Sequence, residues 1–420
     1  MLILYSLALF LLLVVGSPWW LWRMAVSGKY RRGLSERLGF IPDRIRSSFA
    51  GQPVVWIHAV SVGEVLAAGR LIGELALRLP DHRVLVSTTT LTGQTLARER
   101  FGADRVFYFP LDFAFAVRSW LGVLRPCMLV LLETEFWPRM LTECRRAGIP
   151  VAVVNARISD RSWPRYRRLA FLWKRLLGGV SVALAQTELD AERLRALGPA
   201  DVRVTGNLKF DVCAAKTAAV TAALREHLPP GAPVLVCGST LTGEEDLLLD
   251  SLPPGIVTVL APRHPERFSD VAQTLDRRGV PSLRRSAWMQ APAAIPAGTV
   301  FLLDSIGELA SVYALATAAF IGGSLVPMGG HNPLEPSQFG VPIVMGPSFE
   351  NFRGIVDLLR RHNAIRIAAP AELKAALADM LSASPEAHAM GARAREVFAA
   401  EAGATERTVQ ALLALLREHP

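Results

Sequence analysis

The sequence predicts two doubly wound α/β domains that follow an amino-terminal membrane helix. The first observation is an uncharged apolar stretch at residues 2–22, with basic residues after it. The second is an alternation of short apolar runs with amphipathic segments, which is typical of βαβ units. The third is that this alternation starts again after about residue 232. A chain of 420 residues has room for two or three domains, since a domain takes roughly 150 residues.

The first expected element is the membrane helix at residues 2–22. At about 1.5 Å per residue, a helix of this length spans roughly 31 Å, the thickness of one hydrocarbon core. Three tryptophans close the stretch, where indole rings favour the membrane interface. In residues 23–46, seven basic residues outnumber two acidic ones. The positive-inside rule therefore predicts that the rest of the chain is cytoplasmic.

A cleaved signal peptide and a buried core helix are the alternatives for this stretch. A signal peptide carries its basic residues before the apolar run and small residues at its cleavage site. Here the basic residues come after the run, and bulky tryptophans end it. We therefore expect an uncleaved anchor, followed by a basic juxtamembrane segment at residues 23–52. Because Gly16–Ser17–Pro18 could break the helix, both a spanning and a half-embedded form stay open.

The first soluble domain is expected over residues 53–211. Its strands should be continuous apolar runs, as in a parallel sheet covered on both faces. The runs are VVWIHAV (54–60), VLVSTT (84–89), VFYFP (106–110), MLVLLE (128–133), VAVVNA (151–156) and VSVALAQ (180–186).

The second soluble domain is expected over residues 233–420, after a linker at 212–232 that contains Pro229–Pro230–Gly231. Residues 371–418 are expected to form closing helices. Two such domains joined by a hinge predict a cleft, and ligands of these sheets bind at the carboxyl ends of the strands. The expected strands are APVLVCGST (232–240), IVTVLAPR (256–263), TVFLLDS (299–305), AAFIGGS (318–324) and VPIVMGP (341–347).

Three motifs in the first domain carry candidate catalytic residues. HAVSVGE (58–64) places Glu64 at a helix start, where it either caps the helix or acts as a general base. LETEFWP (132–138) holds Glu133 and Glu135, which would point to opposite sides of a continuing strand and so form no metal pair. They orient a catalytic group or are solvated loop acids. In GNLKFD (206–211), Lys209 either neutralises a leaving phosphate or is a surface lysine.

The second domain carries five polar motifs at expected strand ends, and together they indicate a nucleotide pocket. Arg263 is suited to phosphate, whereas His264 lacks a second metal ligand nearby and is interpreted as structural. Glu335 could bind a ribose diol, and Asn332 a phosphate or a sugar. DSIGEL opens a helix whose amino terminus could hold an anion. The motifs are GSTLTGEE (238–245), APRHPERF (261–268), DSIGEL (304–309), IGGS (321–324) and GGHNPLEP (329–336).

Several other chemistries have no signature in the chain. There is no Walker loop, no GxGxxG after the first strand, no GxSxG and no HExxH. The four cysteines form no CxxC, so we expect buried thiols and no bound metal. No aromatic platform is interleaved with the basic residues in the way that nucleic-acid readout needs.

Taken in order, these motifs resemble those of the 3-deoxy-D-manno-octulosonic acid (Kdo) transferases that act on lipid A. The resemblance covers nearly the whole chain and includes NARIS and D-S-x-G-E-L. It implies a GT-B fold of two Rossmann-like domains facing a cleft, with the amino-terminal anchor in the cell inner membrane. It also implies an inverting transfer of Kdo from CMP-β-Kdo to a lipid A precursor, lipid IVA, in lipopolysaccharide biosynthesis. No metal or other cofactor is expected, because CMP-Kdo is the donor substrate.

The same resemblance implies roles for individual residues. Glu64 matches the catalytic base, and Glu133 and Lys209 match residues that stabilise the transition state. The segments that match CMP-binding positions are Pro262–Arg263, Ile306–Gly307–Glu308 and Asn332–Pro333–Leu334–Glu335. A transferase for another nucleotide sugar and a membrane-anchored nucleotide-binding protein without catalysis are the competing hypotheses.

The positive charge of the chain lies in two stretches. The net charge is +9, and residues 23–46 contribute +5 of it. Residues 157–175 hold seven basic residues against one acidic residue, interleaved with aromatic and aliphatic side chains. This pattern is typical of a segment at a membrane interface; a solvated helix is the alternative. We expect the inner membrane and the phosphorylated lipid as partners, and no nucleic acid.

Overall fold

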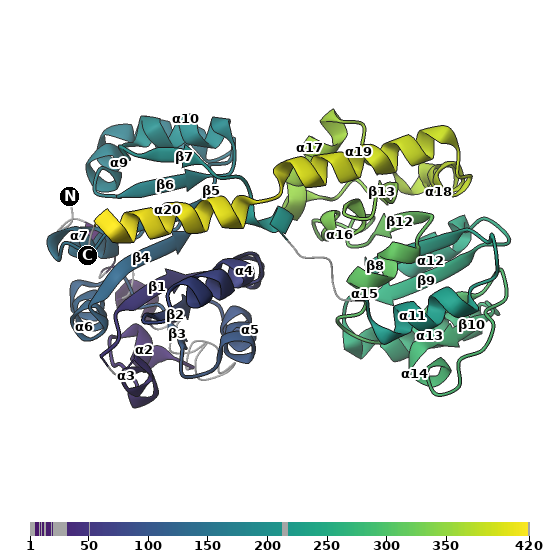
Figure 1. Cartoon of the computed structure of the whole chain (residues 1–420), viewed down its shortest axis with the longest axis horizontal. Coiled ribbons are helices and arrows are strands. Elements are labelled where there is room, and N and C mark those ends of the chain that lie inside the picture. Colours follow the sequence, from purple (N-terminus) through teal and green to yellow (C-terminus); the bar gives the residue numbers. More distant parts are fainter. Residues whose placement is uncertain are drawn as a thin grey trace. The chain divides into compact units, whose positions relative to one another are not determined.

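The computed structural model describes residues 5–7, 9, 11, 14–17, 19, 32–49, 51–211 and 217–418. The chain forms two compact units. The first contains Met1–Asp211 and Gly403–Pro420, and the second contains Val212–Ala402. Each unit is built on a parallel sheet of seven strands with helices on both faces (Figure 1). The predicted pair of doubly wound α/β domains is therefore confirmed.

The first sheet has the strand order β3-β2-β1-β4-β5-β6-β7. The order reverses between β1 and β4, which pair with each other in parallel. Ligands of doubly wound sheets bind beside such a reversal, at the carboxyl ends of the strands. The strands are β1 (Val54–His58), β2 (Arg83–Thr88), β3 (Val106–Tyr108), β4 (Pro126–Leu132), β5 (Val151–Ala156), β6 (Val182–Ala185) and β7 (Val202–Val204).

Helices cover both faces of this sheet. They are α2 (Leu34–Arg37), α3 (Asp43–Phe49), α4 (Val62–Arg78), α5 (Leu91–Phe101), α6 (Ala114–Leu124), α7 (Pro138–Arg146), α8 (Trp163–Arg168), α9 (Ala170–Leu177) and α10 (Glu188–Leu197). A 3-10 helix, η1 (Leu208–Asp211), ends this part of the chain.

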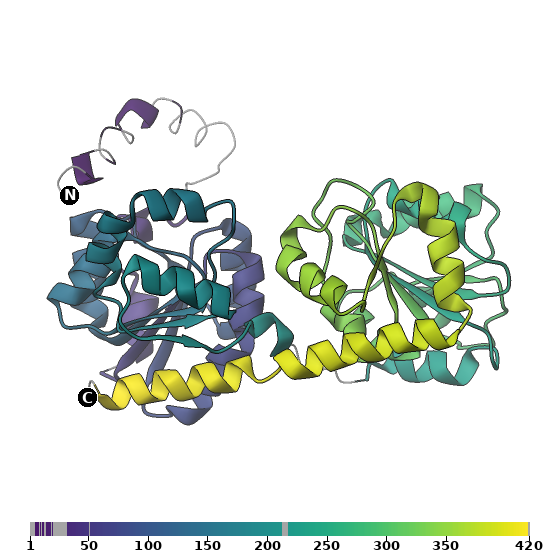
Figure 2. The ribbon, with the colours of Figure 1, turned by 90° about the horizontal axis from the view of Figure 1, so that it is seen from above.

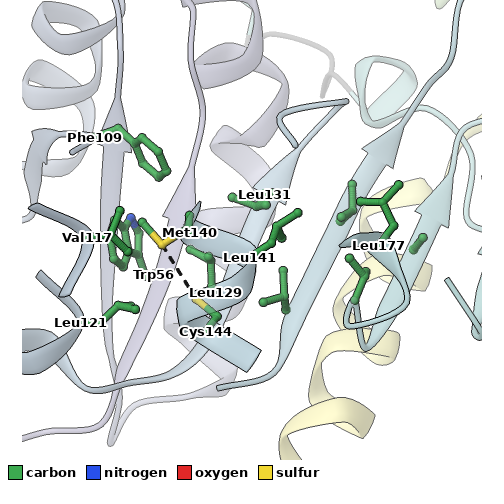
Figure 3. Packing of buried hydrophobic residues seen from close by; sticks show 14 of the residues in the cluster. Trp56, Phe109, Val117, Leu121, Leu129, Leu131, Met140, Leu141, Cys144 and Leu177 are labelled. Carbon is green, nitrogen blue, oxygen red and sulfur yellow. Dashed lines mark hydrogen bonds between the residues drawn. The ribbon is translucent and has the colours of Figure 1, made fainter. Parts of the chain in front are cut away.

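Successive residues of β1 pack into two different cores. All five are buried, and Val54 and Trp56 join one hydrophobic cluster while Val55 and Ile57 join the other. This follows from the period of two in a strand. Figure 3 shows the first cluster, in which Trp56 lies among side chains from the sheet and from α6 and α7. The ring of Trp56 lies 5.3 Å from that of Phe107, and its Nε1 donates to Ser87 Oγ at 2.7 Å.

The second sheet has the order β10-β11-β9-β8-β12-β13-β14, and all its pairings are parallel. Its strands are β8 (Val234–Thr240), β9 (Val257–Pro262), β10 (Ser282–Arg284), β11 (Val300–Leu302), β12 (Ala318–Ile321), β13 (Ile343–Met345) and β14 (Arg366–Ile367). The helices of this unit are α11 (Ala219–His227), α12 (Glu244–Ser251), α13 (Phe268–Arg277), α14 (Arg285–Trp288), α15 (Leu309–Val312), α16 (Leu334–Ser337), α17 (Arg353–Arg361), α18 (Leu373–Leu381) and α19 (Pro385–Glu401).

The last helix, α20 (Ala404–Glu418), packs on the first unit. It contacts α4 and η1, and Figures 1 and 2 both show it in yellow alongside that unit. Its apolar face joins the core through Val409 and Leu412, both fully buried. Arg407 Nε also donates to the carbonyl oxygen of Thr205 at 2.9 Å. The prediction that residues 233–420 form one domain was therefore wrong for this helix.

The linker predicted at residues 212–232 is also shorter than expected. Helix α11 lies within it and belongs to the second unit. Its Thr221 hydroxyl hydrogen-bonds to the hydroxyl of Ser311 at 2.6 Å. The small and apolar residues of α11 bury one face of the helix against that unit, and this distinguishes it from a linker.

The predicted anchor at residues 2–22 and the basic segment at 23–52 lie in part outside the described residues. Where the anchor is described, Tyr5 donates a hydrogen bond to Asp112 Oδ2 at 2.9 Å, and Leu11 and Val15 are exposed. Among the residues that the structure describes, no helix has the length and apolar character to cross a membrane. The spanning helix is thus not shown and stays a prediction.

Candidate active site at the strand ends

Glu64 lies in the first turn of α4, directly after β1. Its side chain is 8% exposed. The backbone nitrogen of Val60 donates to Oε2 at 2.8 Å, and the hydroxyl of Ser61 donates to Oε1 at 3.1 Å. Burial raises the pKa of Glu64 to about 7, with further contributions from the negative charges of Glu133 and Glu135. A carboxylate with a pKa near neutrality is matched to accepting a proton in catalysis.

Glu133 comes directly after β4, the neighbour of β1. Its φ is +53°, a left-handed conformation that costs a non-glycine residue on the order of 1–3 kcal/mol and is concentrated at functional sites. Its backbone nitrogen still donates to the carbonyl oxygen of Val154 at 2.9 Å. The strand ends at Leu132, so the continuing strand on which Glu133 and Glu135 would point to opposite sides is not present.

Both carboxylates instead act electrostatically on Glu64. Burial raises the pKa of Glu135 as well, and the charge of Glu133 adds to that effect. The structure therefore gathers three carboxyl groups beside the reversal of strand order. Burial and the neighbouring negative charges thus both raise the pKa of Glu64 and of Glu135.

Lys209 lies in η1, which the structure fixes to the end of β5. The backbone nitrogen of Leu208 donates to Asn155 Oδ1 at 3.0 Å, and that of Lys209 donates to Asn207 Oδ1 at the same distance. Strand β5 is next to β4 in the sheet. The hydrogen bond from Leu208 to Asn155 therefore holds η1, which contains Lys209, at the same end of the sheet as Glu133. No role for Lys209 is tested by these contacts, so its role stays a prediction.

Asn155 also belongs to this site, although no role was predicted for it. It is 1% exposed and has a φ of +54° at the end of β5. Its Oδ1 holds Leu208, whereas its Nδ2 is buried without a hydrogen-bond partner in the described part of the chain. The signal that could have found it is the asparagine of NARIS at the end of a buried apolar run.

In the second unit, four of the predicted nucleotide motifs follow four neighbouring strands, β11, β9, β8 and β12. The fifth motif, GGHNPLEP (329–336), lies in the connection between β12 and β13, so the expectation that it directly ends a strand was wrong. The strand order reverses between β8 and β12, as it does between β1 and β4 in the first sheet. Gly322 follows β12, and a Cβ there would lie 2.4 Å from the carbonyl oxygen of Ser239, which follows the apolar part of β8. Only glycine permits this close approach of the two strand ends. The four motifs therefore lie together at the carboxyl ends of these strands.

Glu244 holds two of these loops together. Its side chain is fully buried at the start of α12. Oε2 accepts hydrogen bonds from the nitrogens of Leu241 and Gly323, and Oε1 accepts from Ser324 and Leu325, all between 2.6 and 2.9 Å. No role was predicted for Glu244. In the sequence, Glu244 is recognisable only as a carboxylate in the first turn of a helix. That pattern does not indicate a hydrogen-bond partner 80 residues away.

Arg263 connects the loop after β9 with GGHNPLEP. The backbone nitrogen of Arg263 donates to Thr240 at 3.0 Å, while its side chain is exposed. Burial lowers the pKa of His331 to about 4, and the charge of Arg263 contributes. Burial raises the pKa of Glu335, and Arg263 opposes that shift. The guanidinium therefore lies near both residues, with an exposed surface to offer a phosphate.

The other predicted CMP-binding residues differ in how far they are exposed. Pro262, Pro333 and Leu334 are buried and shape the backbone, whereas Ile306 is 63% exposed. Asn332 Oδ1 accepts a hydrogen bond from the nitrogen of Leu334 at 3.1 Å. No contact with a nucleotide is tested by these observations.

The helix predicted to open at DSIGEL cannot hold an anion in the way expected. Helix α15 begins at Leu309 and has four residues, too few for the aligned dipoles on which anion binding depends. Glu308 precedes it and is paired with Arg285, whose Nη2 lies 2.6 Å from Oε1. Gly307, with a φ of +90°, makes the turn. This anion-site prediction was wrong.

Among the described residues, no group of three or more His, Cys, Asp or Glu side chains could hold a metal ion. Cys127, Cys144 and Cys237 are free thiols.

Comparisons with known proteins place this site in context. A family model described as 3-Deoxy-D-manno-octulosonic-acid transferase (kdotransferase) matches residues 32–212. The chain is 36% identical over 420 residues to the 3-deoxy-D-manno-octulosonic acid transferase of Bordetella pertussis, covering 94% of each chain. It is 32% identical over 401 residues to the transferase of the same name from Haemophilus influenzae, covering 92% of each.

Among solved structures, the chain is similar to MurG of Acinetobacter baumannii, with a TM-score of 0.55 and 15% identity over 87% of this chain and 99% of that one. The UDP-GlcNAc 2-epimerase of Neisseria meningitidis gives a TM-score of 0.54 and 13% identity over 86% of this chain and 99% of that one. At these identities the likeness concerns the fold, two Rossmann-like units of the GT-B type.

Proposed function

Since the chain belongs to the 3-deoxy-D-manno-octulosonic acid transferase family, we propose that it transfers Kdo from CMP-β-Kdo to a lipid A precursor with inversion at the anomeric carbon. The acceptor would be lipid IVA, and the reaction would belong to lipopolysaccharide core biosynthesis. The observation that carries the chemical part of the proposal is the buried Glu64 carboxylate, held by Val60 and Ser61 and with a pKa of about 7.

In this reaction Glu64 is the general base. The proton of the acceptor hydroxyl passes to a carboxylate oxygen of Glu64, and the hydroxyl oxygen forms a bond to the anomeric carbon of Kdo. The bond between that carbon and the phosphate oxygen breaks, and its electron pair leaves with CMP. A base with this pKa is partly ionised at neutral pH and still basic enough to accept the proton. The hydrogen bonds to Val60 and Ser61 fix the carboxylate that receives it.

Glu133 and Lys209 would assist the same step. The strained backbone of Glu133 directly after β4 supports a role in the charge balance around Glu64. Lys209 would offset negative charge that develops on the leaving phosphate. Its attachment to the end of β5 through Leu208 and Asn155 supports this assignment.

The second unit would bind the CMP part of the donor. Arg263 would pair with the phosphate, and Glu335 and Asn332 would contact the ribose. The glycine-rich loop after β12, which Glu244 fixes, would bring its backbone close to the nucleotide. The Kdo carboxylate and the phosphate are both anionic, which favours the exposed guanidinium of Arg263 at this edge of the sheet.

The segment 157–175 would rest on the inner membrane. In the structure it forms α8 and α9. Trp163, Tyr166 and Trp173 pack against the core of the first unit, whereas Leu169 and Phe171 are 42% and 70% exposed. The exposed apolar residues are flanked by exposed basic ones: Arg161, Arg165, Arg167, Arg168, Lys174 and Arg175. This arrangement supports attachment to an anionic bilayer on the cytoplasmic side, together with the amino-terminal anchor.

The test is a transfer assay with the full chain in detergent, CMP-Kdo and a tetra-acylated lipid A precursor. Mass spectrometry should show product heavier by Kdo residues, and CMP should be released only when acceptor is present. Glu64→Gln should lower kcat by about 10²- to 10⁴-fold, the usual contribution of a general base, and should keep CMP affinity. Transfer from a different nucleotide sugar only, or full activity of Glu64→Gln, would contradict the proposal or the base assignment, respectively.

A further inference from the structure

A basic pocket in the first unit takes no part in the functions described above. It opens between α2, α3 and the first turns of α5, next to the end of β3, and has a volume of about 420 Å³. That volume is within the range of small-molecule sites, roughly 300–1,000 Å³. The polar and charged residues that form its wall are Arg32, Glu36, Arg44, Gln94, Thr95, Arg98 and Tyr108.

The pocket carries more positive than negative charge. Three arginines line it, and Glu36 is its one carboxylate. Glu36 is 7% exposed, and its Oε2 accepts from the nitrogen of Tyr108 at 2.7 Å. Oε1 pairs with Arg44 Nη2 at 2.5 Å. Arg98 Nη2 is 3.7 Å from the same oxygen, beyond hydrogen-bond distance. One carboxylate thus cannot satisfy the guanidinium groups that surround it.

The donors around the pocket support the same conclusion. Arg44 Nη1 is buried and has no hydrogen-bond partner in the described part of the chain. Burial lowers the pKa of Arg44, and the neighbouring charge of Arg98 lowers it further. The Arg44 and Arg98 side chains are still 30% and 36% exposed, so a ligand can reach them. Two partly exposed guanidinium groups that line one pocket are an arrangement that proteins use for phosphate.

Gln94 holds Arg98 in this position. With its amide oriented to donate to the carbonyl oxygen of Phe107 at 3.1 Å, Gln94 Oε1 accepts from both Nε and Nη2 of Arg98, each at 3.1 Å. The other guanidinium nitrogen, Nη1, is then available to a ligand. The ring of Tyr108, which lines the pocket, also contacts Arg37, whose guanidinium carbon lies 4.5 Å from the centre of the ring.

A continuous set of contacts joins this pocket to the catalytic carboxylate. Val60 donates to Glu64 at 2.8 Å, and the carbonyl oxygen of Val60 accepts from the nitrogens of Thr89 and Thr90 at 3.2 Å. The next residue, Leu91, lines the pocket, and the carbonyl oxygen of Thr89 accepts from Arg37. The loop after β2 therefore has Glu64 on one side and the pocket on the other.

We propose that this pocket binds a phosphomonoester group of the glycolipid acceptor and so positions its attacking hydroxyl towards Glu64. The inference rests on the proposed function, because it takes the acceptor to be a phosphorylated glucosamine lipid. The ligand chemistry is a dianionic phosphate, held by Arg98 and Arg44, with Arg32 at the opening. The pocket is a positioning site and contributes no group to the bond changes.

A binding experiment without donor tests the pocket. The probe is a deacylated glucosamine disaccharide that carries two phosphates, observed by ³¹P NMR with the full chain in detergent. The native chain should broaden one phosphate resonance more than the other. Arg98→Gln and Thr95→Glu should each weaken that effect by about tenfold, since charge-assisted hydrogen bonds are lost or repelled. Thr95→Glu adds a carboxylate to the pocket and leaves the pair of Arg44 with Glu36 in place.

Arg100→Gln is the matched control. Arg100 is exposed, lies on the same helix and does not line the pocket. All three variants change the net charge by the same amount, so a nonspecific charge effect would weaken binding equally in each. Thermal unfolding checks that each variant folds. Equal broadening by the native chain, Arg98→Gln and Thr95→Glu would overturn the proposal. So would a dephosphorylated disaccharide that, added as a competitor, reverses the broadening as well as the unlabelled phosphorylated one does.

Two further measurements separate the possible sources of phosphate and the possible failures. Sedimentation of Arg98→Gln with phosphatidylglycerol vesicles, compared with phosphatidylcholine vesicles, should be the same as that of the native chain. Loss of vesicle binding with unchanged probe binding would assign the pocket to bilayer headgroups and overturn the proposal.

In the transfer assay, Arg98→Gln should raise the acceptor KM and leave kcat within about twofold. If the native chain transferred no Kdo but bound the probe selectively, the proposed function would fail and the pocket would stand.

Discussion

Glu244 Oε2 lies 2.6 Å from the backbone nitrogen of Gly323, a residue 79 positions further along the chain. The same carboxylate accepts three more backbone hydrogen bonds, from Leu241, Ser324 and Leu325. It is fully buried. A single side chain therefore fixes the loops after β8 and β12, on both sides of the reversal of strand order in the second sheet.

Replacing Glu244 by glutamine should weaken both stability and nucleotide binding. The amide of Gln has one acceptor oxygen, so two buried N–H groups lose their partner, at a cost of about 1–3 kcal/mol each. We expect the free energy of unfolding to fall by about 2–4 kcal/mol in urea titrations, and CMP affinity to fall with it. Glu396→Gln, at an exposed position of α19, should change stability by less than about 0.5 kcal/mol. Equal effects of the two changes would contradict this account.

The rate of transfer should depend on the ionisation of Glu64. Its pKa is about 7, above the ordinary value of 4.5, and only the ionised form accepts a proton. We therefore expect kcat/KM to rise with pH, with a midpoint near pH 7, and to level off about one unit above that pH. Glu135→Gln removes a negative charge that acts on Glu64, so it should move the midpoint to lower pH. A midpoint that does not move would show that Glu64 is not the titrating group.

Stability should respond to the same group with the opposite sign. Between about pH 4.5 and 7 the folded chain keeps a proton on Glu64 that the unfolded chain has lost. Folding stability from this group therefore decreases as pH rises through that window, by up to about 1.4 kcal/mol per pH unit. In Glu64→Gln this contribution to the slope should disappear, and urea titrations at pH 5 and pH 7 measure the difference.

Arg263 should matter for the nucleotide and not for the fold. Its side chain is exposed and its backbone makes the bond to Thr240. Arg263→Gln should therefore weaken CMP binding by about tenfold or more in calorimetry, because a charge-assisted bond to phosphate is worth about 1.5–3 kcal/mol. Its unfolding curve should match that of the native chain. Unchanged CMP affinity would remove Arg263 from the donor site.

Charge reversal at Arg165 and Arg168 should release the chain from anionic membranes. Both side chains are exposed on α8, and each basic residue near such a surface contributes on the order of 1 kcal/mol. We expect the Arg165→Glu, Arg168→Glu double variant to sediment less with phosphatidylglycerol vesicles and to show a higher acceptor KM. A double variant at Arg225 and Arg395, exposed in the second unit, is the control. Unchanged partition and KM would remove the membrane role of this segment.

Much of the fold could be predicted because buried parallel strands are continuous apolar runs. The apolar run at 54–60 corresponds to β1 (Val54–His58). Helix α4 begins shortly after it, with Glu64 in its first turn, as predicted. Strands β10 and β14 could not be predicted in this way. They lie at the two edges of the second sheet, are partly exposed and have three and two residues, so no apolar run marks them.

Tertiary contacts account for what the sequence could not predict. Glu133 looked like the last residue of a strand, but β4 ends before it and its backbone is left-handed. Glu244 and Asn155 act through bonds to segments 79 and 53 residues away, and no local pattern encodes these. Helix α20 has the amphipathic pattern of any closing helix, and the pattern does not say which core receives its apolar face.

The position of α20 also has a consequence for the order in which the molecule can be completed. A ribosome makes the chain from its amino terminus, and all seven strands of the first sheet emerge before any strand of the second. Yet Val409 and Leu412, which complete one core of the first unit, come within the last twelve residues. That unit must wait, with an apolar surface uncovered, until the second unit has been synthesised and α20 has followed it.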